Sequence, residues 1–127
     1  MSSAVTDGIR VDVRSTFQQE RSEPAKGRWL FSYDVRIAND GERPAQLLAR
    51  HWIITDAEGR REEVVGEGVV GHQPRLGPGQ EFRYTSYCVL RTPHGSMHGT
   101  YRMVREDGTS FEARIAPFAL MRPGAAN

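Results

Sequence analysis

The sequence predicts an all-β sandwich of about seven antiparallel strands, formed by a single domain over residues 1–127. Apolar and polar residues alternate with a period of two, and turn-forming residues interrupt this pattern about every 8–12 residues. No segment combines a 3.6-residue period with the caps and the length of a helix. A chain of this size can build one hydrophobic core, and we expect an ordered core over about residues 8–121 with flexible termini.

The first two predicted strands lie in the segments GIRVDVRSTF (8–17) and RWLFSYDVRIAND (28–40). In the first, Ile9, Val11 and Val13 alternate with charged residues, which is typical of a half-buried strand. In the second, aromatic and β-branched residues alternate with polar ones in the same way. The polar stretch SEPAKG separates the two strands.

The remaining strands follow from the same pattern. The segment AQLLARHWIITD (45–56) is apolar on both faces, which favours a central strand, and DAEG then turns the chain into RREEVV (60–65) as a hairpin. A further strand is predicted in EFRYTSYCVLRT (81–92). The last hairpin spans GTYRMVREDGTSFEARI (99–115) around the turn REDG, and MRPGAAN (121–127) is expected to be a frayed tail.

A corner motif specifies the kind of sandwich. The run LGPGQEF (76–82) matches the corner that often precedes a strand in fibronectin type III and immunoglobulin-like sandwiches. The aromatic residue of that corner is usually a tyrosine, whereas Phe82 stands here and cannot donate the hydroxyl hydrogen bond. We expect an interior built on Trp52, with contributions from Phe31, Tyr33, Val35, Phe82, Tyr84, Tyr101 and Phe111.

Composition excludes several classes of protein. The chain has 17 Lys and Arg against 16 Asp and Glu, for a net charge of +1, and its basic residues are interleaved with acidic ones. This pattern is not that of a nucleic-acid-binding protein. Cys88 is the only cysteine, which excludes an internal disulfide and favours a reducing compartment. Without a signal peptide or a long apolar segment, we expect a cytoplasmic protein that does not insert into membranes.

A glycine motif is the most suggestive local feature. Gly66, Gly68 and Gly71 have the G-x-G-x-x-G spacing of dinucleotide-binding loops. Such a loop must open a helix, but here prolines and a predicted strand follow, and the acidic residue expected about 20 positions later is missing. We expect these glycines to form turns or bulges. One alternative is a nest of backbone N–H groups that binds an anion beside Arg75, and another is a loop that contacts a partner.

The sequence contains no recognisable catalytic or metal-binding set. The four histidines are His51, His72, His94 and His98. The last two are four residues apart, but the glycines and proline around them argue against a shared helix face, and we expect surface positions in a hairpin loop without a functional metal. Cys88 has the pattern of a small buried residue, and no serine lies in a G-x-S-x-G elbow. We therefore predict no catalytic residues and no cofactor.

Two stretches give the chain a family resemblance: QLLARHWIITDAEGRREEVVGEGVVGHQPRLGPGQEFRYTS and LRTPHGSMHGTYRM. With these motifs the chain resembles the bacterial ApaG family, also called CorD, over essentially its whole length. The resemblance implies a fibronectin type III or immunoglobulin-like fold. It also implies a genetic link to cobalt resistance and magnesium efflux, and a similarity to domains that serve as interaction modules in larger proteins.

Three functional hypotheses follow. The first is a non-enzymatic binding module that acts through a protein partner, with an indirect link to divalent-cation homeostasis. The second is a binder of a phosphate ester or nucleotide that uses Gly66, Gly68, Gly71 and Arg75. The third is an enzyme.

Overall fold

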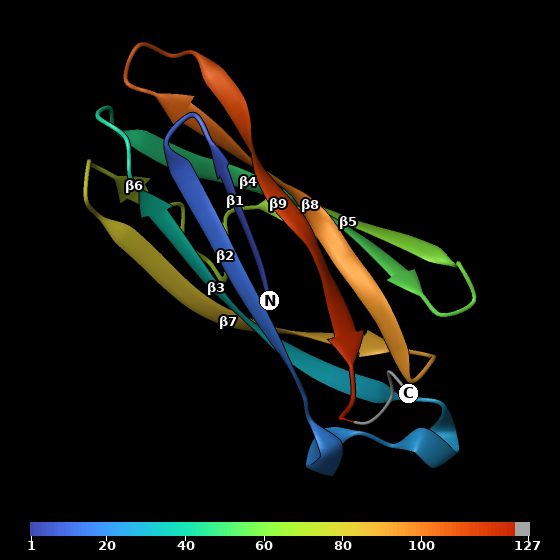
Figure 1. Cartoon of the computed structure of the whole chain (residues 1–127). Helices are drawn as coiled ribbons and strands as arrows, with labels where there is room; N and C mark the ends of the chain where they lie inside the picture. The colour runs from blue at the N-terminus through green and yellow to red at the C-terminus, as the bar shows by residue number, and fades with distance from the viewer. Residues whose placement is uncertain (124–127) are drawn as a thin grey trace.

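The computed structural model describes residues 1–123 and consists almost entirely of β-strands (Figure 1). This confirms the predicted all-β sandwich. The strands are β1 (Ser2–Thr6), β2 (Ile9–Phe17), β3 (Trp29–Asn39), β4 (Ala45–Asp56), β5 (Arg61–Glu67), β6 (Arg75–Leu76), β7 (Glu81–Leu90), β8 (His94–Arg105) and β9 (Ser110–Met121). Two short 3₁₀ helices, η1 (Gln19–Arg21) and η2 (Pro24–Lys26), connect β2 to β3. In this described part of the chain, no helix has the length and apolar character needed to span a membrane.

Two antiparallel sheets form the layers of the sandwich. The first sheet has the strand order β1-β2-β3-β7, and the second has the order β5-β4-β8-β9, with β6 paired to one end of β4. The strands β1 and β7 are therefore the edges of the first sheet, and β5 and β9 are the edges of the second.

The structure contains three strand segments that the sequence analysis did not anticipate. Strand β1 lies ahead of the expected start near residue 8 and pairs with β2 from Ser2↔Val13 to Thr6↔Ile9. The connecting Asp7 and Gly8 form a two-residue hairpin turn, and Asp-Gly is a typical sequence for such a turn. The two-residue strand β6 is also new, and β8 starts at His94 rather than at Gly99. Met121 of the expected tail ends β9, while residues 124–127 lie outside the described part.

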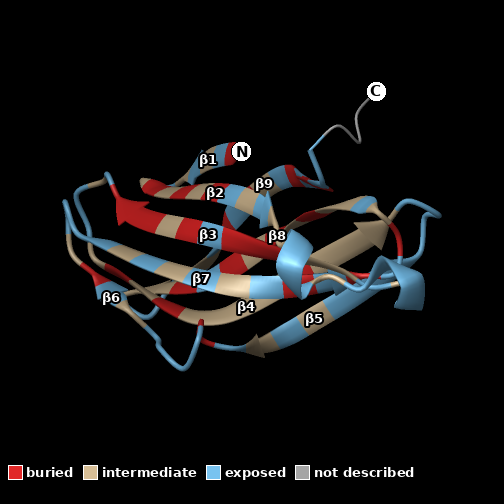
Figure 2. Ribbon diagram, turned by 90° about the horizontal axis from the view of Figure 1, so that it is seen from below, coloured by how far each residue is buried: buried red, intermediate tan, exposed pale blue. Residues whose placement is uncertain are grey.

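The core lies between the sheets and is centred on Trp52. The Trp52 ring meets three other aromatic rings at steep angles, with centroid distances of 5.3 Å to Tyr33, 6.2 Å to Tyr101 and 5.9 Å to Phe118. Figure 2 shows how buried residues concentrate in β3, while β5 is largely exposed. Of the expected core residues, five are buried and three pack against the core while partly exposed, namely Phe82, Tyr84 and Phe111.

A β-bulge in β4 decides which residues of this strand face the core. In its pairing with β8 the register shifts between Leu47 and Ala49, so Leu48 is an extra residue. Before the bulge Leu47 is buried, and after it Trp52 is buried. One residue number is odd and the other is even, so the inward-facing residues change from odd to even numbers at the bulge. Arg50 consequently lies on the same side of β4 as Trp52.

The two long sides of the sandwich differ. On one side, β9 of the second sheet packs against β1 and β2 of the first. The Ser15 hydroxyl donates to the Ala119 carbonyl at 2.7 Å, and the Arg114 amide donates to the Thr6 hydroxyl at 3.0 Å. On the other side, the edge strands β5 and β7 have a cleft between them, which is lined by residues of both. The sandwich is therefore closed along β9 and open between β5 and β7.

Candidate functional site

The glycine motif lies at the end of β5 and in the loop that follows. Gly66 belongs to β5, whereas Gly68 and Gly71 have positive φ angles of +65° and +83°. Val69 and His72 exchange two backbone hydrogen bonds of 2.8 and 2.9 Å around Val70 and Gly71. This arrangement is a two-residue hairpin turn, in which Val70 also has a positive φ angle of 43°, an uncommon conformation for a β-branched residue.

Backbone hydrogen bonds attach this loop to the bulge of β4. The Gly68 amide donates to the carbonyl of Leu48 at 2.8 Å, and the Gln73 side chain donates to the same carbonyl at 3.0 Å. The Leu47 amide donates to the Pro74 carbonyl at 2.9 Å. The amides of Gly68, Val69 and His72 are thus engaged with backbone carbonyls. Arg75 lies beyond the loop, in β6, opposite Gln46 of β4.

Gly66 has a different role, which is to make room for Arg50. The two residues are directly opposite each other in the β4–β5 pairing. A Cβ atom on Gly66 would lie 2.8 Å from three atoms of the Arg50 guanidinium, so a larger residue would displace this flexible side chain from its present position against β5. From there Arg50 Nη1 donates to the carbonyls of Glu67 at 2.9 Å and Gly68 at 3.0 Å. Two members of the glycine motif therefore position an arginine.

Arg50 lines the cleft at the open side of the sandwich. This cleft has a volume of about 370 Å³. Its walls come from β3, β4, β5, β7 and β8, and they include Tyr33, Trp52, Glu62, Ser86 and Cys88. Arg50 is half-buried and takes part in no ion pair among residues 1–123. A half-buried cation that donates only to carbonyls is the most distinctive chemical feature of the cleft.

Three tyrosines surround this arginine in the interior. The hydroxyls of Tyr84 and Tyr101 are hydrogen-bonded to each other, and Tyr33 lines the cleft together with Ser86. Burial raises the pKa of all three phenols, and the nearby Arg50 partly offsets the rise. The phenols therefore remain neutral near pH 7 and act as hydrogen-bonding groups.

Cys88 contributes a thiol of low reactivity to the cleft. Its side chain is 7% exposed, and burial, together with the negative charge of Glu62, raises its pKa to about 12. A thiol with such a pKa is almost fully protonated at neutral pH and is a poor nucleophile. Its place in the structure agrees with the small buried residue predicted from the sequence.

A smaller pocket of about 250 Å³ extends the cleft along the same two edges. It shares Ile54, Glu62 and Val89 with the cleft. Arg61 at the start of β5 and Arg91 just after β7 line it, and neither takes part in an ion pair within the described chain. We call the two pockets together the β5–β7 groove.

The groove has fewer unpaired acidic residues than unpaired arginines. Asp56 is paired with Arg60 at 3.1 Å and also accepts two backbone hydrogen bonds, which lower its pKa despite partial desolvation. Glu62 is the one carboxylate along the groove, in the described chain, without an ion-pair partner. Arg50, Arg61 and Arg91 consequently give the groove an excess of positive charge.

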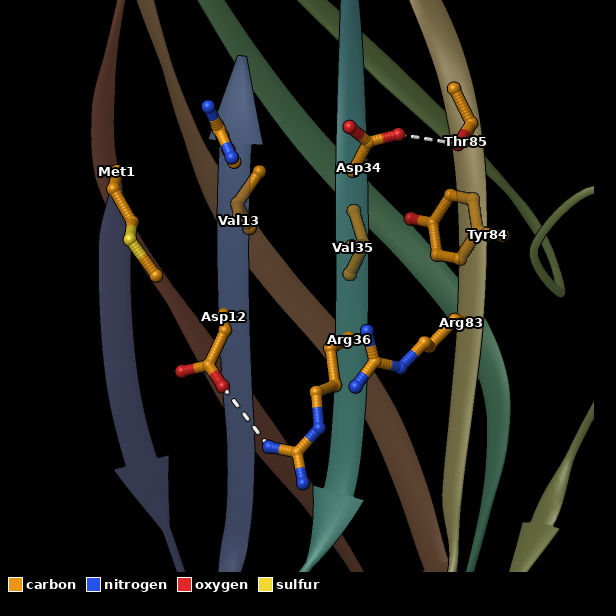
Figure 3. A pocket seen from close by; sticks show the side chains of 10 residues that line it. Met1, Asp12, Val13, Asp34, Val35, Arg36, Arg83, Tyr84 and Thr85 are labelled. Atoms are coloured by element: carbon orange, nitrogen blue, oxygen red, sulfur yellow. Dashed lines mark hydrogen bonds and ion pairs between the residues drawn. The ribbon is translucent and has the colours of Figure 1, made fainter.

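The outer face of the first sheet holds a wider pocket of about 500 Å³, in which part of the charge is paired (Figure 3). Arg36 lies 3.2 Å from Asp12 and 3.3 Å from Glu81, and Thr85 donates to Asp34. Hydrogen bonds from Arg83 and then Arg36 lower the pKa of Glu81. The exposed ion pairs of Arg36 and Arg83 are typical of a solvated charged surface.

The histidines do not lie where the sequence analysis placed them. His94 and His98 belong to strand β8 and not to a hairpin loop, because β8 pairs with both β4 and β9 over this stretch. Four residues of extended chain separate their Cα atoms by roughly 13 Å. Within residues 1–123, no three His, Cys, Asp or Glu side chains are grouped for metal binding.

Sequence reasoning did not identify the groove. Nothing in AQLLARHWIITD shows that a bulge places Arg50 on the inward side of the strand. The pairing of Arg50 with Gly66 depends on the β4–β5 register, which follows only once the hairpin is fixed. The signal that could have located the groove is an arginine at an inward-facing position of one strand, directly opposite a glycine of the next strand.

Comparison with known proteins gives a consistent result. A family model described as the ApaG domain matches residues 19–105. A protein described as Protein ApaG from Anaeromyxobacter dehalogenans strain 2CP-C is 69% identical over 127 residues, covering 100% of both chains. Another of that description from Xylella fastidiosa strain M12 is 52% identical and covers 97% of both. A crystal structure of an ApaA protein from Bordetella pertussis superposes with a TM-score of 0.89 at 51% identity, covering 91% of this chain and 94% of that one.

Proposed function

This chain belongs to the ApaG domain family, and from that premise we propose that it is a non-enzymatic binding module that acts through a protein partner. The partner site on this proposal is the edge of β7, beside the β5–β7 groove. Any link to divalent-cation homeostasis would then run through the partner. A cytoplasmic location fits the free thiol of Cys88, which is buried in the core.

The single observation that supports this site is the open edge of β7. The strand is ten residues long and, among residues 1–123, pairs with β3 alone, so its other side carries backbone groups without a neighbouring strand from this part of the chain. Its exposed side chains include Tyr87 and Val89, with 52% and 43% of their surface accessible. An edge of this kind is a template for an added strand from a partner protein, a common mode of peptide recognition.

The same geometry disfavours the phosphate-ester hypothesis. A nest that binds an anion needs amides that point freely into a concavity. The amides of Gly68, Val69 and His72 instead donate to carbonyls at 2.8–2.9 Å, and Arg75 projects from a separate strand. The glycine motif is better suited to hold Arg50 and the β4 bulge than to hold a nucleotide.

Site-specific photocrosslinking in living cells tests the proposal. A photoreactive phenylalanine analogue replaces Tyr87 on β7, and a matched control replaces Val5 on β1, which is 54% exposed at the opposite side. We expect discrete covalent adducts from position 87 that position 5 does not form. Identical adducts at both positions, or none at position 87, would contradict a partner site on β7.

A further inference from the structure

We propose that the β5–β7 groove recognises an extended peptide with a basic residue at position i, an apolar residue at i+2 and an acidic residue at i+4, all on the face that enters the groove. This inference rests on the proposed binding of a partner at β7 and specifies the chemistry of that partner. It is drawn from the inner side of β5, which presents a negative, an apolar and a positive group in succession.

A strand added to β7 would lie over the inner side of β5. On the closed side of the sandwich β9 packs against β1 and β2, so the strand order of each sheet brings β7 and an added neighbour toward the β5 edge. A strand that pairs with β7 continues the first sheet, and every second side chain of this strand points toward the second sheet. On β7 itself, Ser86 and Cys88 are such inward residues and line the cleft. Alternate side chains of the peptide would therefore enter the groove beside them.

Three groups of different character follow one another along the inner side of β5. In the β4–β5 pairing, Gly66 is opposite Arg50 and Glu62 is opposite Ile54, with Val64 midway between them on β5. The Arg50 guanidinium lies against Gly66, and Val64 and Glu62 line the cleft. Gly66 and Glu62 are four residues apart, or roughly 13 Å along the strand. The groove therefore has a positive end, an apolar middle and a negative end.

The same two levels recur on β7. Tyr101 is opposite Arg50 in the β4–β8 pairing, and its hydroxyl is hydrogen-bonded to Tyr84 of β7, so Tyr84 lies at the level of Arg50. Cys88 and Glu62 both line the cleft, and the negative charge of Glu62 adds to the effect of burial in raising the pKa of Cys88. Tyr84 and Cys88 are also four residues apart. Positions i and i+4 of an added strand can therefore face both charges at once.

Arg50 selects an acidic side chain at one end of the groove. Its Nη1 group donates to the carbonyls of Glu67 and Gly68, while its Nε and Nη2 groups make no hydrogen bond among residues 1–123. The guanidinium is half-buried and has no ion-pair partner in that range. A peptide carboxylate would supply a charge-assisted hydrogen bond at this position.

Glu62 selects a basic side chain at the other end. Its carboxylate takes part in no ion pair within the described chain. Arg61 is its neighbour in sequence, but Arg61 is opposite Thr55 and alternates to the outer face of β5. A peptide lysine would lay its apolar stem along Ile54 and Val89, which line the groove with Glu62, and bring its ammonium group to the carboxylate. An acidic residue at the same position would meet a like charge.

The order of the two charges follows from the direction of the added strand. The paired strands among residues 1–123 all run antiparallel, and we expect the peptide to run antiparallel to β7. The peptide residue beside Cys88 then precedes the one beside Tyr84 by four positions, so the basic residue comes first. The reversed order would place each charge next to a group of the same sign.

Fluorescence anisotropy with synthetic peptides tests this pattern on the full chain. Three labelled ten-residue peptides rich in Thr have the same composition. The first carries Lys at i, Val at i+2 and Glu at i+4, the second exchanges Lys and Glu, and the third moves Glu to i+3, where it faces outward. We expect the first to bind at least about tenfold more tightly than the second and about threefold more tightly than the third. Amide NMR shifts should map its binding to β7.

Variants of the protein assign each end of the groove to its residue. Glu62→Lys should make a peptide with Glu at both i and i+4 the tighter binder, by about threefold over the first peptide. Glu63→Lys is the matched control, because this exposed neighbour makes the same change of charge on the outer face of β5, beside His51, and should preserve the original order of affinities. Arg50→Gln should reduce the preference for Glu over Gln at i+4 to less than about twofold.

Several outcomes would overturn the inference. Equal affinity for the two orders of charge, tighter binding of the reversed order, or no binding of the first peptide at millimolar concentration would each do so. An equal effect of Glu62→Lys and Glu63→Lys would show that net charge, and not the groove, decides the preference. If crosslinking at position 87 succeeds while the charge pattern fails, only this inference is lost. If crosslinking fails, the proposed function is lost as well.

Discussion

At the residue scale, Gly68 and Gly71 allow a clean separation of backbone strain from steric conflict. Both have positive φ angles, but a Cβ on Gly68 would lie 2.5 Å from the His72 carbonyl oxygen, whereas a Cβ on Gly71 would meet nothing within 4 Å. We expect Gly71→Ala to lower the free energy of unfolding by about 1 kcal/mol and Gly68→Ala to lower it by about 2–3 kcal/mol or more. Urea denaturation measures both, and equal losses would show that the loop relaxes away from the contact.

The same residues explain why the motif misleads a reader of the sequence. Glycine at 66 leaves room for the end of the Arg50 side chain, and glycine at 68 is required by the approach of a carbonyl oxygen. The sequence indicated correctly that no helix follows, which argued against a nucleotide loop. It could not show that Arg50, some 16 positions earlier, is what the first glycine accommodates.

At the element scale, edge strands and central strands should differ in hydrogen exchange. β3 lies between β2 and β7, whereas β7 and β5 each have one strand neighbour. We expect most amides of β3 to exchange only through global unfolding, and about every second amide of β7 to exchange far faster, because that half points away from β3. Native-state exchange followed by NMR measures this. Uniform protection along β7 would contradict an open edge and indicate that another chain covers it.

Element prediction from the sequence succeeded where alternation was uninterrupted and failed where local geometry changed it. The segments of β2, β3 and β7 follow from their period-two pattern, and that of β5 follows from the turn before it. β1 was missed because Val5 is the one large apolar residue in Ser2–Thr6, although Asp7 and Gly8 form a turn. The start of β8 was missed because its glycines resemble a loop, yet Gly95 and Gly99 are needed where β8 packs closely on the β4 backbone.

At the scale of the whole molecule, buried phenols and the buried thiol make stability depend on alkaline pH. Burial raises the pKa of Tyr84, Tyr101 and Tyr33, and raises that of Cys88 to about 12. In the unfolded chain these groups ionise near their ordinary values of about 10 and 8.5. The unfolded state then releases protons that the folded state retains, so stability is full below about pH 8.5 and falls as the pH rises above it.

The measurement is the urea midpoint at intervals between about pH 7.5 and 10.5, over which we expect a continuous decline. Cys88→Ala should reduce the decline that begins near pH 8.5, and Tyr84→Phe should reduce the part that begins near pH 10. Each variant is compared with its own midpoint at pH 7.5, so a uniform loss of stability does not affect the result. A midpoint independent of pH would show that these groups ionise freely in the folded protein.

The bulge at Leu48 matters for the attachment of the glycine loop and not for the two faces of β4. Because Leu48 is one residue in excess of the β8 register, its removal would bring the two halves of β4 into a single uninterrupted alternation. Leu47, Arg50 and Trp52 would keep their present sides, because the register on β8 runs from one half of β4 to the other without a gap. The loop carbonyl contacts at Leu48 would be lost in the same event. A deletion at position 48 would therefore separate the two roles of β4, because it would keep the strand that carries the core and remove the carbonyl that holds the loop.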